Sequence, residues 1–126
     1  MNKHKVLIVD DVAVNRLMVN KMLGTFGMEV MEACNGLEAL EALRHFEADV
    51  ILLDLMMPVM DGFEMLRILR ANPLTTHIPV IVLSALNTND DIVAAYNAGA
   101  NDFVTKPILF EKLVSSVNAQ LSQEQR

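Results

Sequence analysis

Three aspartates stand where short apolar runs of the chain end. Asp10 and Asp11 follow residues 6–9, and Asp54 follows residues 50–53. Carboxylates that are brought together repel one another, and a hard divalent cation such as Mg²⁺ offsets this repulsion because it prefers oxygen ligands. If the folded chain gathers these three residues, they offer a metal site and a nucleophilic carboxylate.

Two further polar residues, Ser84 and Lys106, follow later apolar segments. Ser84 closes the run 80–83, and Lys106 comes just after residues 102–104 and before Pro107. The lysine ammonium is a compact positive charge that can pair with a carboxylate or with phosphate oxygens. A carboxylate beside a metal and a lysine can act as a nucleophile toward phosphorus, because both cations stabilise the charge on the transferring group.

The elements that must position these residues alternate between short apolar runs and amphipathic segments. Residues 6–9, 50–53 and 80–83 are apolar on both faces, which is typical of parallel strands covered on both sides, and residues 29–33 and 102–104 are weaker strand candidates. Helix starts are predicted at Asn35 and Asp61, each followed three residues later by Glu, and a helix end at Gly99. Helical spacing marks five helices by their apolar positions: Val14, Leu17, Met18 and Met22; Leu37, Leu40 and Leu43; Met65, Leu66 and Leu69; Ile92, Ala95 and Tyr96; Leu109, Leu113, Val114, Val117 and Leu121. The three leucines of the second set are expected to form the inner face of their helix, whereas Val93 and Tyr96 are expected at the surface.

This alternation predicts a (βα)5 fold, an α/β domain with a doubly wound, five-stranded parallel sheet in the flavodoxin-like strand order 2-1-3-4-5. Ligands of such sheets bind beyond the carboxyl ends of the strands, which is where the polar residues fall. A chain of 126 residues suits one domain and is too short for two. We therefore expect residues 1–126 to form a single domain, with residues 122–126 as a frayed tail.

Composition and charge exclude several functions. A net charge of −6 argues against direct nucleic-acid binding by this chain. No apolar run approaches the roughly 20 residues that cross a bilayer, so we expect neither membrane insertion nor a signal peptide at the N-terminus. The single cysteine, Cys34, cannot form an internal disulfide, and a reducing cytoplasmic location is expected.

Together these motifs make essentially the whole sequence resemble the receiver domain of response regulators in two-component and phosphorelay signalling. The resemblance lies in the Asp10-Asp11 pair, the segment from Asp54 to Gly62 (Asp-Leu-Met-Met-Pro-Val-Met-Asp-Gly), Ser84-Ala85, and Phe103 through Lys106-Pro107. The 30 residues from Asp54 to Ser84 and the 22 from Ser84 to Lys106 also fit the family.

The resemblance implies that Asp54 accepts a phosphoryl group from the phosphohistidine of a sensor histidine kinase or histidine phosphotransfer protein. It implies Mg²⁺ as the cofactor, bound by Asp11, Asp54 and the backbone carbonyl of Met56, with Asp10 acting through water. Because a receiver promotes only its own phosphorylation and dephosphorylation, the chain is not expected to be an enzyme.

The resemblance also implies a switch. Ser84 and Lys106 would each hold a phosphate oxygen, and the Lys106–Pro107 peptide would be cis. Phe103 would turn inward as Ser84 moves toward the phosphate, which changes a partner-binding face made by the fourth helix, the fifth strand and the fifth helix. A downstream protein or output domain would bind that face.

Other interpretations remain open at this point. The chain could be a docking pseudo-receiver that is never phosphorylated. A phosphatase of the haloacid-dehalogenase kind needs a second aspartate two residues after its nucleophile, where Met56 stands. A flavodoxin-like cofactor binder needs a phosphate-cradling loop after the first strand, which is absent. The stretch 11–16 resembles the start of the first helix in hybrid-kinase and phosphorelay receivers, which favours a multidomain or relay setting over a free-standing receiver.

Overall fold

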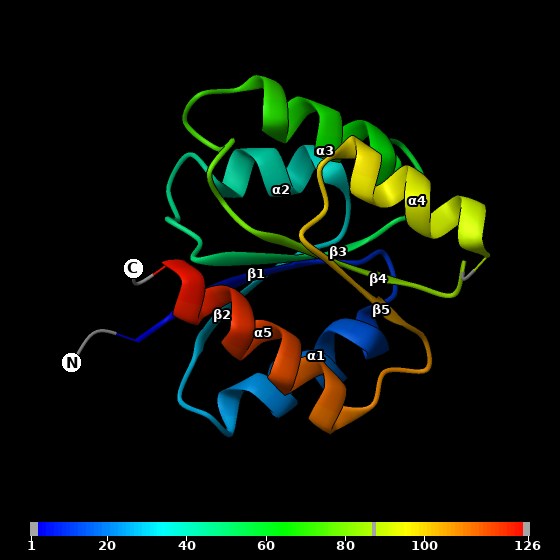
Figure 1. Cartoon of the computed structure of the whole chain (residues 1–126). Helices are drawn as coiled ribbons and strands as arrows, with labels where there is room; N and C mark the ends of the chain where they lie inside the picture. The colour runs from blue at the N-terminus through cyan, green and yellow to red at the C-terminus, as the bar shows by residue number, and fades with distance from the viewer. Residues whose placement is uncertain (1–2, 87, 125–126) are drawn as a thin grey trace.

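Five strands and five helices alternate along the chain in the computed structural model, which describes residues 3–86 and 88–124. The elements are β1 (Lys5–Val9), α1 (Ala13–Gly24), β2 (Glu29–Ala33), α2 (Gly36–Ala42), β3 (Val50–Asp54), α3 (Gly62–Ala71), β4 (Val80–Ser84), α4 (Asn89–Ala98), β5 (Asp102–Thr105) and α5 (Phe110–Glu124). All neighbouring strands pair in parallel in the order β2-β1-β3-β4-β5. The predicted (βα)5 fold and its strand order are confirmed, with α1 and α5 on one face of the sheet and α2, α3 and α4 on the other (Figure 1).

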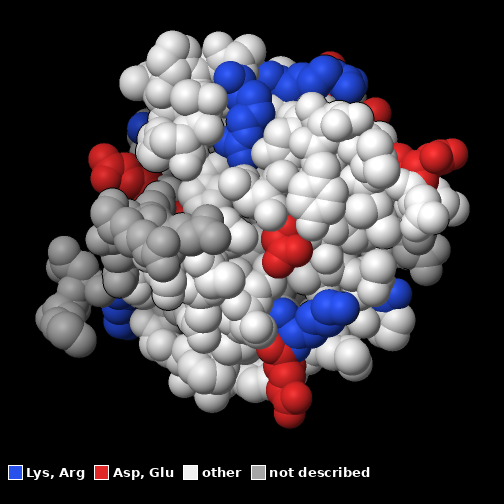
Figure 2. Space-filling view, viewed as in Figure 1, with Lys and Arg blue, Asp and Glu red and all other residues white. Residues whose placement is uncertain are grey.

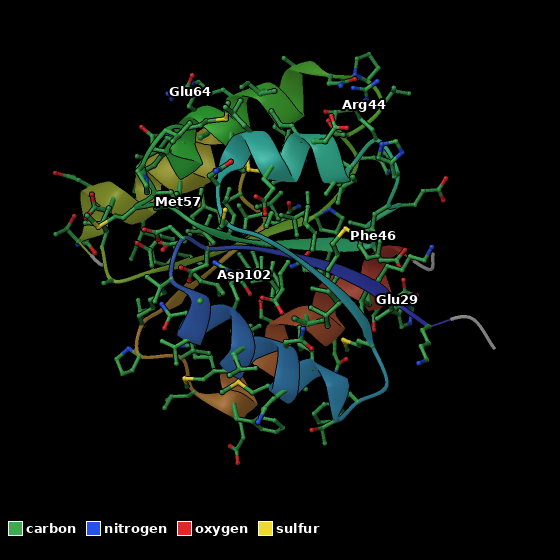
Figure 3. All side chains as sticks on the ribbon, turned by 180° about the vertical axis from the view of Figure 1, so that it is seen from behind. Glu29, Arg44, Phe46, Met57, Glu64 and Asp102 are labelled. Atoms are coloured by element: carbon green, nitrogen blue, oxygen red, sulfur yellow. The ribbon has the colours of Figure 1, made fainter. Side chains whose placement is uncertain are left out.

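Both faces of the sheet are buried because successive strand residues point to opposite sides. In β1, Leu7 and Val9 join the core that packs against α2, α3 and α4, whereas Val6 and Ile8 join the core that packs against α1 and α5. Every residue of β3 and of β4 is buried. Side chains fill the space on both sides of the sheet, as the view from behind shows (Figure 3). The apolar runs of the sequence are therefore strands enclosed between two helical layers.

Side-chain caps fix where the helices on one face begin. The side chain of Asn35 accepts the Glu38 N–H at the start of α2, and that of Asp61 accepts the Glu64 N–H at the start of α3. Helix α4 ends at Gly99, whose φ of 116° lies in the left-handed region that glycine adopts without a steric penalty. The two predicted starts and the predicted end are confirmed.

Of the apolar stripe predicted for α1, Met22 is partly buried against the core, whereas the other three residues face outward. Val14, Leu17 and Met18 are 58%, 51% and 49% exposed, whereas Val19 and Leu23 make the buried contacts with the sheet. The helix carries apolar residues on two sides, so their spacing alone does not decide which side meets the sheet. An apolar surface remains on the outside of α1.

Leu37 in α2 and Leu109, which precedes α5, are also exposed. Gly36 and Ala39 make the buried contacts of α2 instead. Leu40 and Leu43 are partly buried and pack against the core on that side of the sheet, so two of the three residues of the predicted inner face are confirmed. Val93 and Tyr96 in α4 are exposed, as expected. The apolar residues that mark α3, Met65, Leu66 and Leu69, are all fully buried.

Helix α5 continues through Glu124, so residues 122–124, which were predicted to fray, are helical. Residues 125–126 lie outside the described part of the chain. Among the described residues, no helix has the length and hydropathy that a membrane span requires.

Candidate functional site

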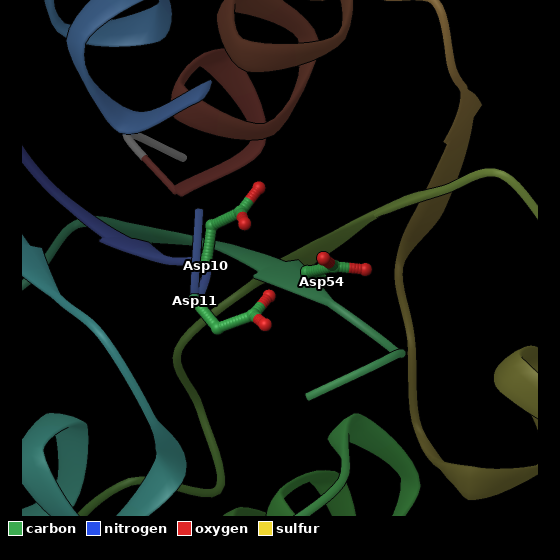
Figure 4. Close-up of side chains that lie close together, drawn as sticks. All are labelled: Asp10, Asp11 and Asp54. Atoms are coloured by element: carbon green, nitrogen blue, oxygen red, sulfur yellow. The ribbon is translucent and has the colours of Figure 1, made fainter. Parts of the chain in front are cut away.

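The carboxyl ends of β1 and β3 bring three aspartates together. β1 and β3 are neighbours, with Val9 opposite Leu53, so the residues that follow them, Asp10 and Asp54, lie side by side. One carboxylate oxygen from each of Asp10, Asp11 and Asp54 lies within 4.8 Å of the other two. Figure 4 shows the three side chains leaving neighbouring strand ends toward the same side. The predicted acidic cluster is present.

Backbone amides orient two of the carboxylates. Asp10 Oδ1 accepts the Val12 N–H at 2.9 Å, and Asp54 Oδ1 accepts the Met56 N–H at 3.1 Å. Both side chains are buried, and Asp54 is only 6% exposed, whereas Asp11 is exposed. The second oxygens, Oδ2 of Asp10 and of Asp54, accept hydrogen bonds from Lys106 Nζ at 3.1 and 3.3 Å.

Lys106 reaches this site from the end of β5. Its backbone N–H donates to the Ser84 carbonyl at 2.9 Å, which ties the segment after β5 to the end of β4. The Lys106–Pro107 peptide is cis, as predicted. Burial disfavours the ammonium form, but the hydrogen bond to Asp10 and the charge of Asp54 outweigh it, so the pKa of Lys106 is raised. The lysine is therefore a fixed positive charge between two carboxylates.

The electrostatics of Asp54 are unfavourable without a cation. Burial raises the pKa of its carboxyl group, and the charge of Asp10 adds to the rise, whereas the Met56 N–H and Lys106 lower it without cancelling it. Within the described part of the chain, three carboxylates face a single ammonium group, so negative charge is in excess. Clustered carboxylate oxygens with such an excess fit a hard divalent cation.

A neutral substitution at Asp54 is expected to stabilise the fold in the absence of Mg²⁺. Because the folded pKa lies above the ordinary value of 3.8, the carboxylate lowers stability at neutral pH, and this loss is relieved as the pH falls through the raised pKa. Asp54→Asn should therefore raise the free energy of unfolding at pH 7 by about 1 kcal/mol, the usual size of a single-site effect. The gain should shrink at acidic pH, and urea unfolding at several pH values checks this. A variant less stable than wild type at pH 7 would contradict it.

The remaining predicted residues lie at the same edge of the sheet. Ser84 ends β4 one residue beyond Leu83, the partner of Asp54, and its fully buried Oγ accepts the Leu86 N–H at 3.0 Å. Phe103 is half-buried and packs against the core on the α2, α3 and α4 side. The Met56 side chain is exposed, whereas its backbone faces Asp54.

Two residues that support the site were not among the predicted site residues, although Gly62 ends the segment that resembles the family. A Cβ on Gly62 would lie 2.6 Å from both the Asp54 carbonyl oxygen and the Leu55 Cα, so only glycine lets α3 start this close to β3. The sequence does indicate this role of Gly62, because a glycine stands directly after the Asp61 cap, at a position where a helix-forming residue is expected. Arg16 donates from Nη1 to the Asp10 carbonyl at 2.7 Å, and nothing in its spacing indicates this contact.

Known proteins match this fold and site over most of the chain. Residues 6–118 match the response regulator receiver domain family. The response regulator PleD of Caulobacter vibrioides is 41% identical over 104 residues, which cover 82% of this chain and 23% of PleD. The chain spans about half the length, or less, of the curated relatives that it matches.

Solved structures agree with the sequence match. The receiver domain of a signal transduction histidine kinase from Syntrophus aciditrophicus superposes with a TM-score of 0.91 at 35% identity, covering 98% of this chain and 93% of that one. The receiver domain of the sensor histidine kinase PA1611 from Pseudomonas aeruginosa has a TM-score of 0.88 at 28% identity, covering 96% and 99%, and holds a magnesium ion coordinated in its active-site cleft. With the sheet order, the acidic cluster and these matches in agreement, the chain belongs to the response regulator receiver domains of two-component signalling.

Proposed function

We propose that this receiver domain is a phosphoryl-accepting switch in which Asp54 takes a phosphoryl group from a phosphohistidine of a sensor histidine kinase or a histidine phosphotransfer protein. The observation that carries the proposal is the setting of Asp54: its buried carboxylate lies beside Asp10 and Asp11 and 3.3 Å from Lys106 Nζ. A nucleophile needs this combination when negative charge builds up on a transferring phosphoryl group.

The acidic cluster is the proposed Mg²⁺ site. Asp11 and Asp54 would supply carboxylate oxygens and Met56 its backbone carbonyl, with Asp10 acting through water. The excess of carboxylates over cationic groups supports this assignment, as does the magnesium ion in the PA1611 receiver domain. When bound, Mg²⁺ would neutralise charge on the carboxylates and on phosphate oxygens.

In the transfer itself, an Asp54 carboxylate oxygen forms the new O–P bond. The P–N bond of the phosphohistidine breaks, and its electron pair stays on the imidazole nitrogen. The Lys106 ammonium group then donates its hydrogen bond to a phosphate oxygen instead of a carboxylate oxygen. This is a small movement for the flexible lysine side chain. The Ser84 hydroxyl donates to another phosphate oxygen. The chain acts only on its own phosphoryl group, so we infer a switch and not an enzyme with a separate substrate.

The switch is proposed to run from Ser84 through Phe103 to the α4–β5–α5 face. The phosphoryl group adds about −1.5 to −2 charge and three acceptor oxygens, which draw Ser84 and the segment after it inward. Phe103 then turns into the space that opens. Its N–H donates to Asp102 Oδ1 at 2.8 Å, and Asp102 also accepts hydrogen bonds from Tyr96 in α4 (3.4 Å) and from Ser116 in α5. These contacts support a coupled output face, because they join its three elements to Phe103.

The exposed apolar side of α1 is the proposed docking surface for the phosphodonor protein. Val14, Leu17 and Met18 lie on its outside. Met18 also lines a cleft of about 440 Å³, together with other residues of α1, Ala85 after β4, and Lys106 and its neighbours after β5. An exposed apolar patch of this kind marks a protein interaction surface. Its position beside Lys106 would place the donor histidine next to Asp54.

We further infer that residues 1–126 work as one cytoplasmic domain that does not contact nucleic acid directly. The net charge of −6 supports this, and on the face seen in Figure 2 the basic side chains lie in small separate groups. Any contact with DNA would then belong to a separate output domain or protein.

Incubation with Mg²⁺ and a small-molecule phosphodonor tests the proposal. Intact-mass spectrometry should detect one base-labile phosphoryl adduct on the wild type and none on Asp54→Asn. The matched control is Asp61→Asn, which changes a helix-capping aspartate in the same loop. Asp61→Asn should still form the adduct, since asparagine also caps helices well. An unmodified wild type, or an equal adduct on Asp54→Asn, would overturn the assignment.

A further inference from the structure

The turn between β1 and α1 carries two of the three aspartates but has no side-chain cap. Helix α1 begins after Val12, whose side chain accepts no hydrogen bond from the first turn. Arg16, one turn into the helix, reaches back instead, and its Nη1 donates to the Asp10 carbonyl oxygen at 2.7 Å. The N–H of Asp10 donates to the Ala33 carbonyl of β2 at 3.1 Å.

Holding the Asp10 carbonyl also determines where Asp11 points. That carbonyl belongs to the planar peptide that joins the two aspartates, so its direction fixes the start of the Asp11 backbone. Within the described part of the chain, no hydrogen bond or ion pair orients the Asp11 carboxylate itself. Its place in the cluster therefore depends on the backbone that carries it.

Arg16 is in turn held from the neighbouring strand. Its Nε donates to Glu32 Oε1 at 3.1 Å, and the other Glu32 oxygen accepts the Asn20 side-chain amide at 2.9 Å. The Arg16 side chain is only 17% exposed. Because the guanidinium is a rigid planar fork, fixing Nε on Glu32 fixes the direction in which Nη1 points.

We propose that Arg16 is a positioning residue for the cation site, holding the Asp10–Asp11 peptide so that the Asp11 carboxylate faces the cation. The inference rests on the proposed Mg²⁺ site and deepens it. Arg16 touches neither the cation nor the phosphoryl group and acts through the backbone. Glu32 and Asn20 support it from the other side.

The direction in which Arg16→Met changes Mg²⁺ affinity shows whether Arg16 acts by positioning the metal ligands or only through its positive charge. Loss of a positive charge near a cation site should by itself tighten Mg²⁺ binding. Loss of positioning should weaken it, by roughly tenfold, the lower end of the effect of removing groups that orient metal ligands. Isothermal titration of the full chain with Mg²⁺, without phosphodonor, gives the dissociation constant, and urea unfolding without Mg²⁺ gives the stability separately.

Two further variants make the test decisive. Arg44→Met removes the same charge from a side chain that is 73% exposed and paired with Glu41, and it should leave Mg²⁺ affinity unchanged. Arg16→Lys keeps the charge but cannot make both contacts, so it should weaken Mg²⁺ binding several-fold even if Arg16→Met fails to fold. Unchanged or tighter binding by the Arg16 variants, with or without a loss of stability, overturns the role of Arg16 alone. A wild type that binds no Mg²⁺ overturns the cation site and this inference together.

Discussion

Lys106→Met is expected to tighten Mg²⁺ binding and, at the same time, to slow phosphoryl acceptance by about 100-fold, the lower end of what loss of one stabilising donor costs. Without a cation, Lys106 Nζ occupies oxygens of Asp10 and Asp54 at 3.1 and 3.3 Å, so it competes with Mg²⁺ for the same charge. During transfer the same ammonium is the only lysine or arginine group within ion-pairing distance of Asp54 in the described part of the chain. The single substitution should therefore raise the affinity for Mg²⁺ and lower the rate of phosphoryl acceptance.

Methionine matches the length of lysine, so the packing around the site should change little. Mg²⁺ titration gives the affinity, and the time course of adduct formation at saturating Mg²⁺ gives the rate. Lys112→Met, on the exposed side of α5, removes an equal charge from a residue for which the described part of the chain shows no ion pair with Asp10 or Asp54, and it should change neither value. If Lys106→Met lowers Mg²⁺ affinity, or accepts phosphoryl at the wild-type rate, Lys106 does not have the proposed double role.

The sequence predicted those parts of the fold that depend on local chemistry. Strands enclosed on both faces need continuous apolar runs, and helix starts need a capping side chain, so both were visible from residues close together in the chain. The acidic cluster was also predictable, because parallel strands end at one edge of a sheet. Asp10, Asp11 and Asp54 thus lie together although more than 40 residues separate the pair from Asp54.

What could not be predicted depends on how elements pack on one another. Helix α1 has apolar residues on two sides, and only its docking against the sheet buries Val19 and Leu23 while leaving Leu17 outside. The link from Arg16 to Glu32 joins a helix to a strand 16 residues later, with no spacing rule to reveal it. Such contacts support the site without belonging to its motifs.

The site also opposes the stability of the fold that carries it. A buried aspartate with a raised pKa and a three-carboxylate cluster both destabilise the native state unless a cation is present. The surrounding structure must therefore hold the strand ends firmly. At Gly62, the start of α3 lies so close to the end of β3 that an added Cβ would meet backbone atoms of Asp54 and Leu55.

Gly62→Ala is expected to lower the free energy of unfolding by about 3 kcal/mol, as overpacking of a well-packed core does. The added Cβ would lie 2.6 Å from the Asp54 carbonyl oxygen and from the Leu55 Cα, which are backbone atoms of a central strand and the residue after it, and cannot rotate away. The Gly62 N–H donates to the Leu55 carbonyl at 3.0 Å, so moving α3 outward also breaks that bond. Because the displaced segment includes Met56, Mg²⁺ affinity should fall as well.

Gly24→Ala is the matched control for this prediction. Gly24 ends α1, its added Cβ would meet nothing within 4 Å, and alanine is the better helix former. That variant should be as stable as the wild type or slightly more stable, with unchanged Mg²⁺ affinity. Urea unfolding and Mg²⁺ titration of both variants separate loss of glycine in general from loss of this glycine. Equal stability of the two variants would mean that α3 can move away from β3 at little cost, and that the strand end bearing Asp54 is not held in place by this contact.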